Sequence, residues 1–376
     1  MGIEFLSFLK RKKKNKNADN GIGLQTVEPE KVPEYTPGIQ DDGTSIIRLV
    51  SNKKVKKPYK VSGIDDVASK NNWKAWLYLA PVIILVTIFL LYPLINTIFI
   101  SITKNYDYAT GKYEGFTISN FGFILNLAKY NGVKNDFFIK YALPNTFVIA
   151  FVTVPISIAL ALIISVALNS IKFFQKFLQT VFFLPYVTNA VAIGMVFSVL
   201  FNDQGLINYI FHLQNAGGAN VPMHWLNMTP EGNNLIPMIP LCLFIVWNSI
   251  PFKILILLSG LQGIDKQYYQ AAQIDAAPKW KTFFRITVPL LSPQILYLMI
   301  TSFIGAFKEY NSIVAIFGKE GESIPGKMNM YTVVFYVYAN IVDHTSFAAA
   351  AAVFLFVIIL IFTFIQFWAS SKRVHY

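Results

Sequence analysis

The sequence predicts an all-α membrane protein with six transmembrane helices. Of its 376 residues, 54% are hydrophobic and only 14% are charged, whereas soluble domains carry about 25% charged residues. The mean hydropathy is +0.47, and the chain contains six predominantly apolar stretches of 21 to 31 residues without Asp, Glu, Lys or Arg. Each stretch is long enough to cross the bilayer core as a helix, which needs about 20 apolar residues.

The boundaries of the predicted spans follow these uncharged stretches. Backbone polar groups find no water in the bilayer core, so an apolar stretch crosses it as a helix. A further uncharged stretch, Met328–Val342, has 15 residues and three tyrosines, and we expect it at the membrane interface or partly buried in protein. The six predicted spans are residues 76–102, 142–169, 177–202, 234–262, 287–314 and 345–370.

The positive charges predict the orientation of these spans. With six spans both chain ends lie on one side, and the segments on that side hold 23 of the 32 Lys and Arg residues. The loops on the other side hold 7, and Lys253 and Lys308 fall within or beside spans. Because cytoplasmic segments next to spans are enriched in Lys and Arg, the pattern predicts that both ends are cytoplasmic.

Residues 1–72 have a different composition from residues 73–376. The first 74 residues hold 15 of the 32 Lys and Arg residues and few large apolar ones. This predicts a basic, largely disordered cytoplasmic tail followed by a six-span membrane domain. Nearly half of the Lys and Arg residues therefore lie in the tail, and the net charge of +12 does not by itself indicate a nucleic-acid partner. The tail either attaches to anionic lipid or is a solvated segment that helps to fix topology, and the second interpretation is favoured.

The loop between the fourth and fifth spans, residues 263–286, has the pattern of two short amphipathic helices. The first is expected around Asp265 to Asp275 and the second from Pro278 toward Ile286. Proline suits the first turn of a helix, because its missing N–H would have no helical acceptor there. On the cytoplasmic side this hairpin offers one apolar and one basic surface to a soluble partner.

The same loop resembles that of a transporter family. The permease subunits of binding-protein-dependent type I ABC importers carry the pattern E-A-A-x-x-D-G-A-x5-F-x-x-I-x-x-P-x-x-x-P. Eight of its ten fixed positions match here at unbroken spacing, and the departures are Gln270 in place of Glu and Ala276 in place of the turn glycine. The corresponding residues are Gln270, Ala271, Ala272, Asp275, Ala276, Ala277, Phe283, Ile286, Pro289 and Pro293.

The resemblance covers roughly residues 75 to 370 and is closest to the maltose-type, oligosaccharide-transporting branch. It is also carried by the segment from Trp76 to Ser101, by Phe183-Leu184-Pro185, and by the segment from Trp247 to Phe252. It implies the type I ABC importer permease fold in a bacterial plasma (inner) membrane. It further implies a second permease subunit, two cytoplasmic ATPase subunits that grip the loops, and an extracellular solute-binding protein that delivers a sugar, with an oligosaccharide favoured.

Polar groups within the spans are the candidates for a substrate pathway, because such groups tend to face the protein interior or a water-filled cavity. A sugar presents hydroxyl groups and apolar ring faces, so a site for it should combine amides or charges with aromatic side chains. The polar candidates are Asn189, Asn248, Lys253, Lys308, Glu309 and Asn311. The aromatic candidates are Tyr186, Trp247 and Tyr310.

No pattern in the sequence indicates a catalytic, metal or cofactor site. The four histidines are dispersed, and Cys242 is the single cysteine, so no set of metal ligands has suitable spacing. Gly111-Lys112-Tyr113 and Gly318-Lys319-Glu320 lack the glycine spacing and hydroxyl of a phosphate-binding loop. We therefore expect no enzyme activity in this chain, with ATP and Mg bound by the partner ATPases.

Two other classes of membrane protein remain alternatives. An ion-coupled secondary transporter or channel would show inverted repeats or several carboxylates within the membrane, and Glu309 is the single candidate acid. A membrane-embedded enzyme would show a nucleophile with a base, or a metal-ligand set. Interpretation as an importer permease subunit accounts for more of the sequence features than either of these alternatives.

Overall fold

The computed structural model describes residues 34–39, 45–50, 72–132, 135, 137–171, 175–210, 223–226, 235–319, 321 and 329–370. The chain divides into two compact units, Met1–Pro81 and Val82–Tyr376. In the first unit, strands β1 (Glu34–Ile39) and β2 (Ser45–Val50) pair antiparallel, from Glu34 opposite Val50 to Ile39 opposite Ser45. Most of the predicted tail lies outside the described residues, so its proposed disorder stays a prediction.

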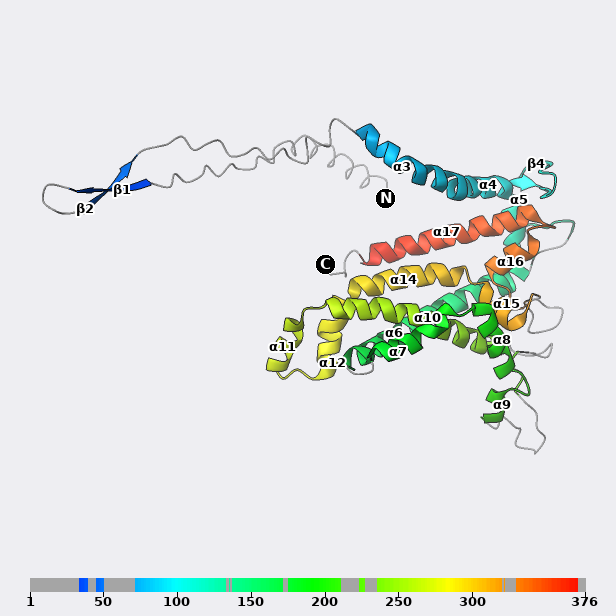
Figure 1. The fold of residues 1–376 in the computed structure, drawn as a ribbon. Helices are drawn as coiled ribbons and strands as arrows, with labels where there is room; N and C mark the ends of the chain where they lie inside the picture. Colours follow the sequence, from blue (N-terminus) through cyan, green and yellow to red (C-terminus); the bar gives the residue numbers. More distant parts are fainter. Residues whose placement is uncertain are drawn as a thin grey trace. The chain divides into compact units, whose positions relative to one another are not determined.

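The rest of the described chain is mainly helical, and four of its helices are long and apolar enough to cross a membrane (Figure 1). The first runs over Trp76–Ser101 and contains part of α3 (Asn72–Val86), η2 (Thr87–Leu91) and α4 (Tyr92–Ser101). The second, Phe138–Ser170, joins η3 (Phe138–Ala142) to α6 (Leu143–Ser170). The others are α10 (Leu235–Gly263) and α17 (Thr345–Ser370).

Proline explains the wide π-helical turns in these helices. Pro93, Pro144 and Pro289 each follow a five-residue π turn after one intervening residue. Proline cannot donate to the carbonyl four residues back and clashes with it. The residue before each proline instead donates to the carbonyl five residues back, as the N–H of Tyr92 does to Thr87. The helices therefore continue through these prolines with one widened turn.

Two further apolar segments are bent pairs of helices. Residues 177–187 of α7 (Gln175–Val187) and α8 (Ala190–Leu200) meet at 92°. The second pair comprises residues 279–290 and α14 (Ser292–Phe307), which meet at 67°. The chain thus has four candidate spans, or six if each pair counts as one. The count of six and the cytoplasmic placement of both ends stay predictions.

The third and fifth predicted spans are not continuous helices. In the third, Thr188 and Asn189 separate α7 from α8. In the fifth, α14 ends at Phe307 and a separate helix, α15 (Asn311–Phe317), begins after Lys308, Glu309 and Tyr310. The first break lies in a stretch without charged residues, so charge could not reveal it, whereas the second break contains Lys308 and Glu309.

Within the second unit, α6 packs along α10 and α14, and α17 lies beside α14 and α4 (Figure 1). Small hydroxyl residues line the contact between α6 and α10. Ser165 Oγ donates to the carbonyl of Ala161 at 2.6 Å and reaches that of Ile254 across the interface at 3.3 Å. Small residues allow helix backbones to approach closely in a membrane protein, where burial against lipid-like surroundings supplies little driving force.

Shorter elements lie at the end of the second unit opposite α11 and α12 (Figure 1). Asn120 joins two of these parts, because its Nδ2 donates to the carbonyls of Ser101 and Thr103, both at 2.8 Å. The short elements are β3 (Thr103–Lys104), β4 (Gly115–Phe116), α5 (Ser119–Ile124), α9 (Leu206–Ile210), α15 and α16 (Val333–Asn340).

At the other end, the segment after α10 forms the predicted hairpin. It contains α11 (Lys266–Ile274), α12 (Lys279–Thr282), η4 (Phe283–Thr287) and then α13 (Val288–Leu290). The Asp265 carboxylate caps α11 by accepting from the N–H of Gln267 at 3.0 Å, as Asp does at helix starts. We use "the hairpin" for residues 263–286.

The turn that ends α11 places Ala276 in the left-handed region, with φ of 49°. The N–H of Ala277 donates to the carbonyl of Ala272 at 2.9 Å, and that of Ala276 to Gln273 at 3.0 Å. This is the pair of hydrogen bonds of a Schellman motif, whose left-handed position glycine normally occupies. Ala276, which stands where the family motif has glycine, therefore introduces backbone strain.

We expect Ala276→Gly to stabilise the hairpin by about 1 kcal/mol, because glycine adopts a positive φ without the steric cost that alanine bears. Hydrogen exchange at the amides of residues 275–277 measures this local stability. The matched control is Ala271→Gly, within α11, which should instead destabilise the hairpin by about 1 kcal/mol. Faster exchange in Ala276→Gly would contradict the strain.

We expect Gly194→Ala to destabilise the fold by about 1–3 kcal/mol through overpacking. A Cβ at Gly194 would overlap the Ala315 Cβ, because α8 and α15 are in direct contact there. Thermal unfolding followed with a thiol-reactive dye at Cys242, the single cysteine, reports the loss. Gly305→Ala, where a Cβ meets nothing within 4 Å, is the control.

The double variant Gly194→Ala with Ala315→Gly tests the cause, because it removes the opposing methyl group. It should recover most of the lost stability through coupling between neighbouring sites. Equal destabilisation by the single and double variants would show that the two helices do not depend on this contact.

Candidate functional site: a pocket between helices and a surface hairpin

A pocket of about 390 Å³ lies among α6, the break between α7 and α8, α10 and α14. We call it the interhelical pocket. Its volume is within the range of small-molecule sites, and its lining combines hydroxyl, amide, charged and aromatic side chains. The lining residues are Thr153, Val154, Tyr186, Thr188, Ala190, Ile245, Asn248, Ser249, Phe252, Lys253, Thr301, Ser302, Gly305, Ala306 and Glu309.

Both helix breaks border this pocket. Thr188 and Ala190 come from the break between α7 and α8, and Glu309 comes from the break between α14 and α15. Nonhelical backbone at membrane depth is tolerated where it is buried in protein or lines a cavity. The positions of the breaks are therefore those expected for a substrate cavity in a transporter.

Four of the nine candidates for the substrate pathway, Tyr186, Asn248, Lys253 and Glu309, line the interhelical pocket. Tyr186 stacks on Phe252, with ring centroids 5.8 Å apart and an interplanar angle of 18°. Both rings belong to the pocket lining and offer an apolar surface. The Glu309 carboxylate accepts a hydrogen bond from the N–H of Ser312 at 3.0 Å, near the start of α15.

The other five candidates, which include the exposed Lys308, are not among the residues that line the pocket. Asn189 caps α8 by accepting from the N–H of Val191 at 2.9 Å. Trp247 lies 5.4 Å from Phe197, measured between ring centroids. Tyr310 stacks on Tyr338 at 4.5 Å, and Asn311 is the exposed first residue of α15. Substrate contact by any of the nine residues stays a prediction.

Hydroxyl residues supply much of the remaining polar lining, and the sequence did not single them out. Thr153, Thr188, Ser249, Thr301 and Ser302 line the pocket. Serine and threonine are common in membrane helices and often bond to their own helix, as Thr301 Oγ1 does to the carbonyl of Tyr297 at 2.8 Å. Their identity therefore carries little signal without the fold.

Lys253 is the buried cation of the pocket, with 4% of its surface exposed. Its ammonium group donates to Ser157 Oγ at 2.7 Å and to Ser249 Oγ at 2.8 Å. Ser157 and Ser249 each donate in turn to a carbonyl of their own helix at 3.0 Å. The lysine is thus positioned by contacts with both α6 and α10.

The hairpin is the second candidate site, because it exposes large apolar side chains. Ile274 is 85% exposed and Trp280 is 74% exposed, and Trp280 stacks on Phe284 at 6.0 Å. Exposed apolar groups gathered in this way mark interaction surfaces. They are accompanied by the exposed basic residues Lys266, Lys279, Lys281 and Arg285.

The motif residues of the hairpin have different environments. Ala272 is buried within the hairpin, and Tyr269 Oη lies 3.2 Å from Thr287 Oγ1. These contacts hold the first helix of the hairpin against the segment that leads into α14. The exposed motif residues are Gln270, Ala271, Asp275 and Ala276. The half-buried ones are Ala277, Phe283, Ile286, Pro289 and Pro293.

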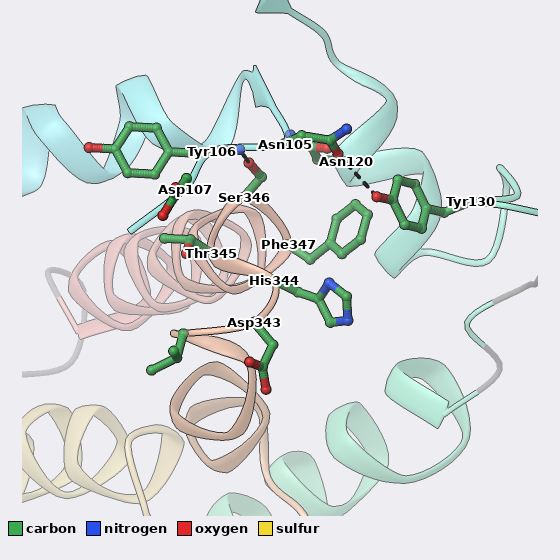
Figure 2. Close-up of a pocket in the computed structure, with 11 residues that line it drawn as sticks. Asn105, Tyr106, Asp107, Asn120, Tyr130, Asp343, His344, Thr345, Ser346 and Phe347 are labelled. Carbon is green, nitrogen blue, oxygen red and sulfur yellow. Dashed lines mark hydrogen bonds between the residues drawn. The ribbon is translucent and has the colours of Figure 1, made fainter. Parts of the chain in front are cut away.

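A third feature is a pocket of about 310 Å³ between the segment after α4 and the start of α17 (Figure 2). The N–H of Tyr106 connects the two segments by donating to Ser346 Oγ at 3.0 Å. The Oη of Tyr130, which follows α5, donates to Asn105 Oδ1 at 3.1 Å. Figure 2 shows that Asp343 and His344 point in different directions. Among the described residues, no group of three or more His, Cys, Asp or Glu could hold a metal ion.

Two relatives are similar to this chain over most of its length. The lactose transport system permease protein LacF of Rhizobium radiobacter is 29% identical over 327 residues, which are 86% of this chain and 98% of that protein. The arabinooligosaccharides transport system permease protein AraP of Bacillus subtilis is 27% identical over 318 residues, 83% of this chain and 93% of that protein.

A solved structure has a similar fold. A chain of the bacterial alginate ABC transporter, in complex with its alginate pentasaccharide-bound periplasmic protein, superposes with a TM-score of 0.61. The similarity covers 82% of this chain and 96% of that chain at 19% sequence identity. It confirms the predicted permease fold.

The family model for "binding-protein-dependent transport system inner membrane component" matches residues 157–375, more than half of the 376 residues. The match includes the hairpin and every lining residue of the interhelical pocket except Thr153 and Val154. The resemblance stated from the hairpin motif is thereby confirmed. The chain belongs to this family and is a multi-pass plasma-membrane permease of a binding-protein-dependent importer.

Proposed function

We propose that this permease imports a sugar, with an oligosaccharide favoured, that an extracellular solute-binding protein delivers. The relatives named above transport lactose and arabinooligosaccharides, which supports a sugar substrate. The interhelical pocket supports it too, because its hydroxyl and amide groups can bond to sugar hydroxyls while Tyr186 and Phe252 cover a ring face.

The energy for import comes from ATP hydrolysed by separate subunits. The sequence has no phosphate-binding loop, so ATP and Mg are assigned to two cytoplasmic ATPases. The observation that carries this proposal is the hairpin, where Trp280, Phe284 and Ile274 are exposed beside four basic residues. Exposed aromatic side chains are the usual anchors of a protein interface.

The hairpin is connected to the pathway by its position in the chain. It follows α10, which carries Asn248 and Lys253, and it leads into α14, which carries Thr301 and Ser302. A displacement of the hairpin by an ATPase would therefore act on two helices that line the interhelical pocket. A second permease subunit of the same family completes the pathway.

Uptake into proteoliposomes tests the proposed function. The full chain is reconstituted with its partner permease, the ATPases and the solute-binding protein, and uptake of labelled lactose and arabinotriose is measured. We expect uptake of at least one sugar that requires internal ATP and the binding protein. Uptake driven by an ion gradient without nucleotide would contradict the proposal and favour a secondary transporter.

We expect Trp280→Ala to weaken ATPase docking by about tenfold or more, because truncating an interface anchor costs roughly 2 kcal/mol. Substrate-stimulated ATP hydrolysis and co-purification of the ATPase measure the loss. Thermal stability should change little, since the side chain is exposed.

Trp76→Ala is the matched control, because Trp76 is 67% exposed and belongs to a predicted span and not to the hairpin sequence. It should leave ATPase docking unchanged. Equal co-purification of the ATPase with wild type and Trp280→Ala would reject the hairpin as the docking surface.

A further inference from the structure

Lys253 is a cation for which the described part of the chain supplies no counter-ion. No carboxylate of the described residues lies within 4.0 Å of its ammonium nitrogen, and its two hydrogen-bond partners are serine hydroxyls. A buried cation without an opposite charge is destabilising, and ionisable residues within membrane segments usually serve function. The chain retains this cation at the wall of a cavity.

Glu309 lines the same pocket but does not neutralise Lys253. Its carboxylate is directed to α15 through the N–H of Ser312, and no ion pair joins the two residues among the described contacts. A carboxylate at the start of a helix is already stabilised by the helix dipole. The charge of Lys253 is therefore available to a molecule in the pocket.

The hydrogen bonds of Lys253 leave it one donor. An ammonium group has three N–H donors, and two of them are directed to Ser157 and Ser249. Among the described residues no other acceptor takes the third. The first turn of α8 also borders the pocket at Ala190, and the start of a helix favours negative charge.

We propose that Lys253 recognises an anionic group, a carboxylate or a phosphate, on the sugar that enters the interhelical pocket. The substrate class is therefore an acidic sugar: its charged group bonds to Lys253, its hydroxyls to Asn248 and the Ser and Thr residues, and its ring lies against Tyr186 and Phe252. Hydrogen bonds between two charged groups are stronger than neutral ones. This inference rests on the proposed sugar-import function.

Binding of matched probes to the full chain in lipid nanodiscs tests the inference. Digalacturonate and its dimethyl ester have the same rings, but only the first is anionic; glucose 6-phosphate and glucose form the second pair. We expect at least one anionic probe to bind about tenfold or more tighter than its neutral counterpart, as a charge-assisted contact would give. The pair that shows the preference identifies the anionic group as carboxylate or phosphate.

Lys253→Met should remove this preference, so that each anionic probe binds within about twofold of its neutral counterpart. The apolar chain of methionine fills similar space, and the Ser157 and Ser249 hydroxyls keep their helix carbonyls as acceptors. Lys253→Arg should retain the preference. The matched control is Lys129→Met, which removes an exposed lysine that does not line the pocket and should retain it too.

A merely structural lysine would give a different result: Lys253→Met would weaken both members of a pair equally and lower the unfolding temperature. That result overturns the inference, as does the absence of any Lys253-dependent advantage for both anionic probes. The sugar-import proposal would still stand if the Lys253→Met transporter kept ATP-dependent uptake of neutral sugar, so the two failures are distinguishable.

Discussion

The need to satisfy every backbone polar group in a nonaqueous medium is the constraint on which this structure depends. In the long helices the backbone N–H and C=O groups bond to each other, but at the breaks around Asn189 and Glu309 some of them have no helical partner. Side chains satisfy them instead: Asn189 accepts from the N–H of Val191, and Thr332 Oγ1 donates to the carbonyl of Glu309 at 2.7 Å. Because side chains supply hydrogen-bond partners for backbone groups at both breaks, the helices can be interrupted beside a polar pocket.

The two helix breaks also form part of the wall of the interhelical pocket. Glu309 lines the pocket with its side chain and is part of the connection to α15. Thr188 lines it from the other break. The contact between Gly194 and Ala315 brings the two helices that follow these breaks together. A movement of α14 would therefore change both the pocket and the packing of α8.

The sequence predicts the long helices well, because charge marks where apolar stretches end. The helices Trp76–Ser101 and Thr345–Ser370 coincide with uncharged stretches bounded by lysine or aspartate. The hairpin was found from its motif, and the consequence of Ala276 could be foreseen, because the motif has glycine at that position. Its positive φ follows from the turn that the spacing requires.

The helix breaks and most of the pocket lining could not be predicted from the sequence. Residues 177–202 contain no charged residue, and the signal at Asn189 is a helix-capping residue, which is common in other settings. Trp247 and Tyr310 are aromatic, as a sugar site requires, yet they pack on Phe197 and Tyr338. Which aromatic side chain faces a cavity depends on helix rotation, and a uniformly apolar segment does not fix that rotation.

The central claim is that the interhelical pocket belongs to a pathway that ATP hydrolysis opens to alternate sides. Labelling of a pocket cysteine tests it most directly: Thr301→Cys is introduced with Cys242→Ser, so that the pocket holds the single thiol, and sealed vesicles of the whole transporter receive a charged thiol reagent from one side. The account predicts that labelling from the outside rises in the ATP-bound state and falls without nucleotide, with the reverse from the inside. Labelling that is the same in both states, or absent from both sides, would contradict it.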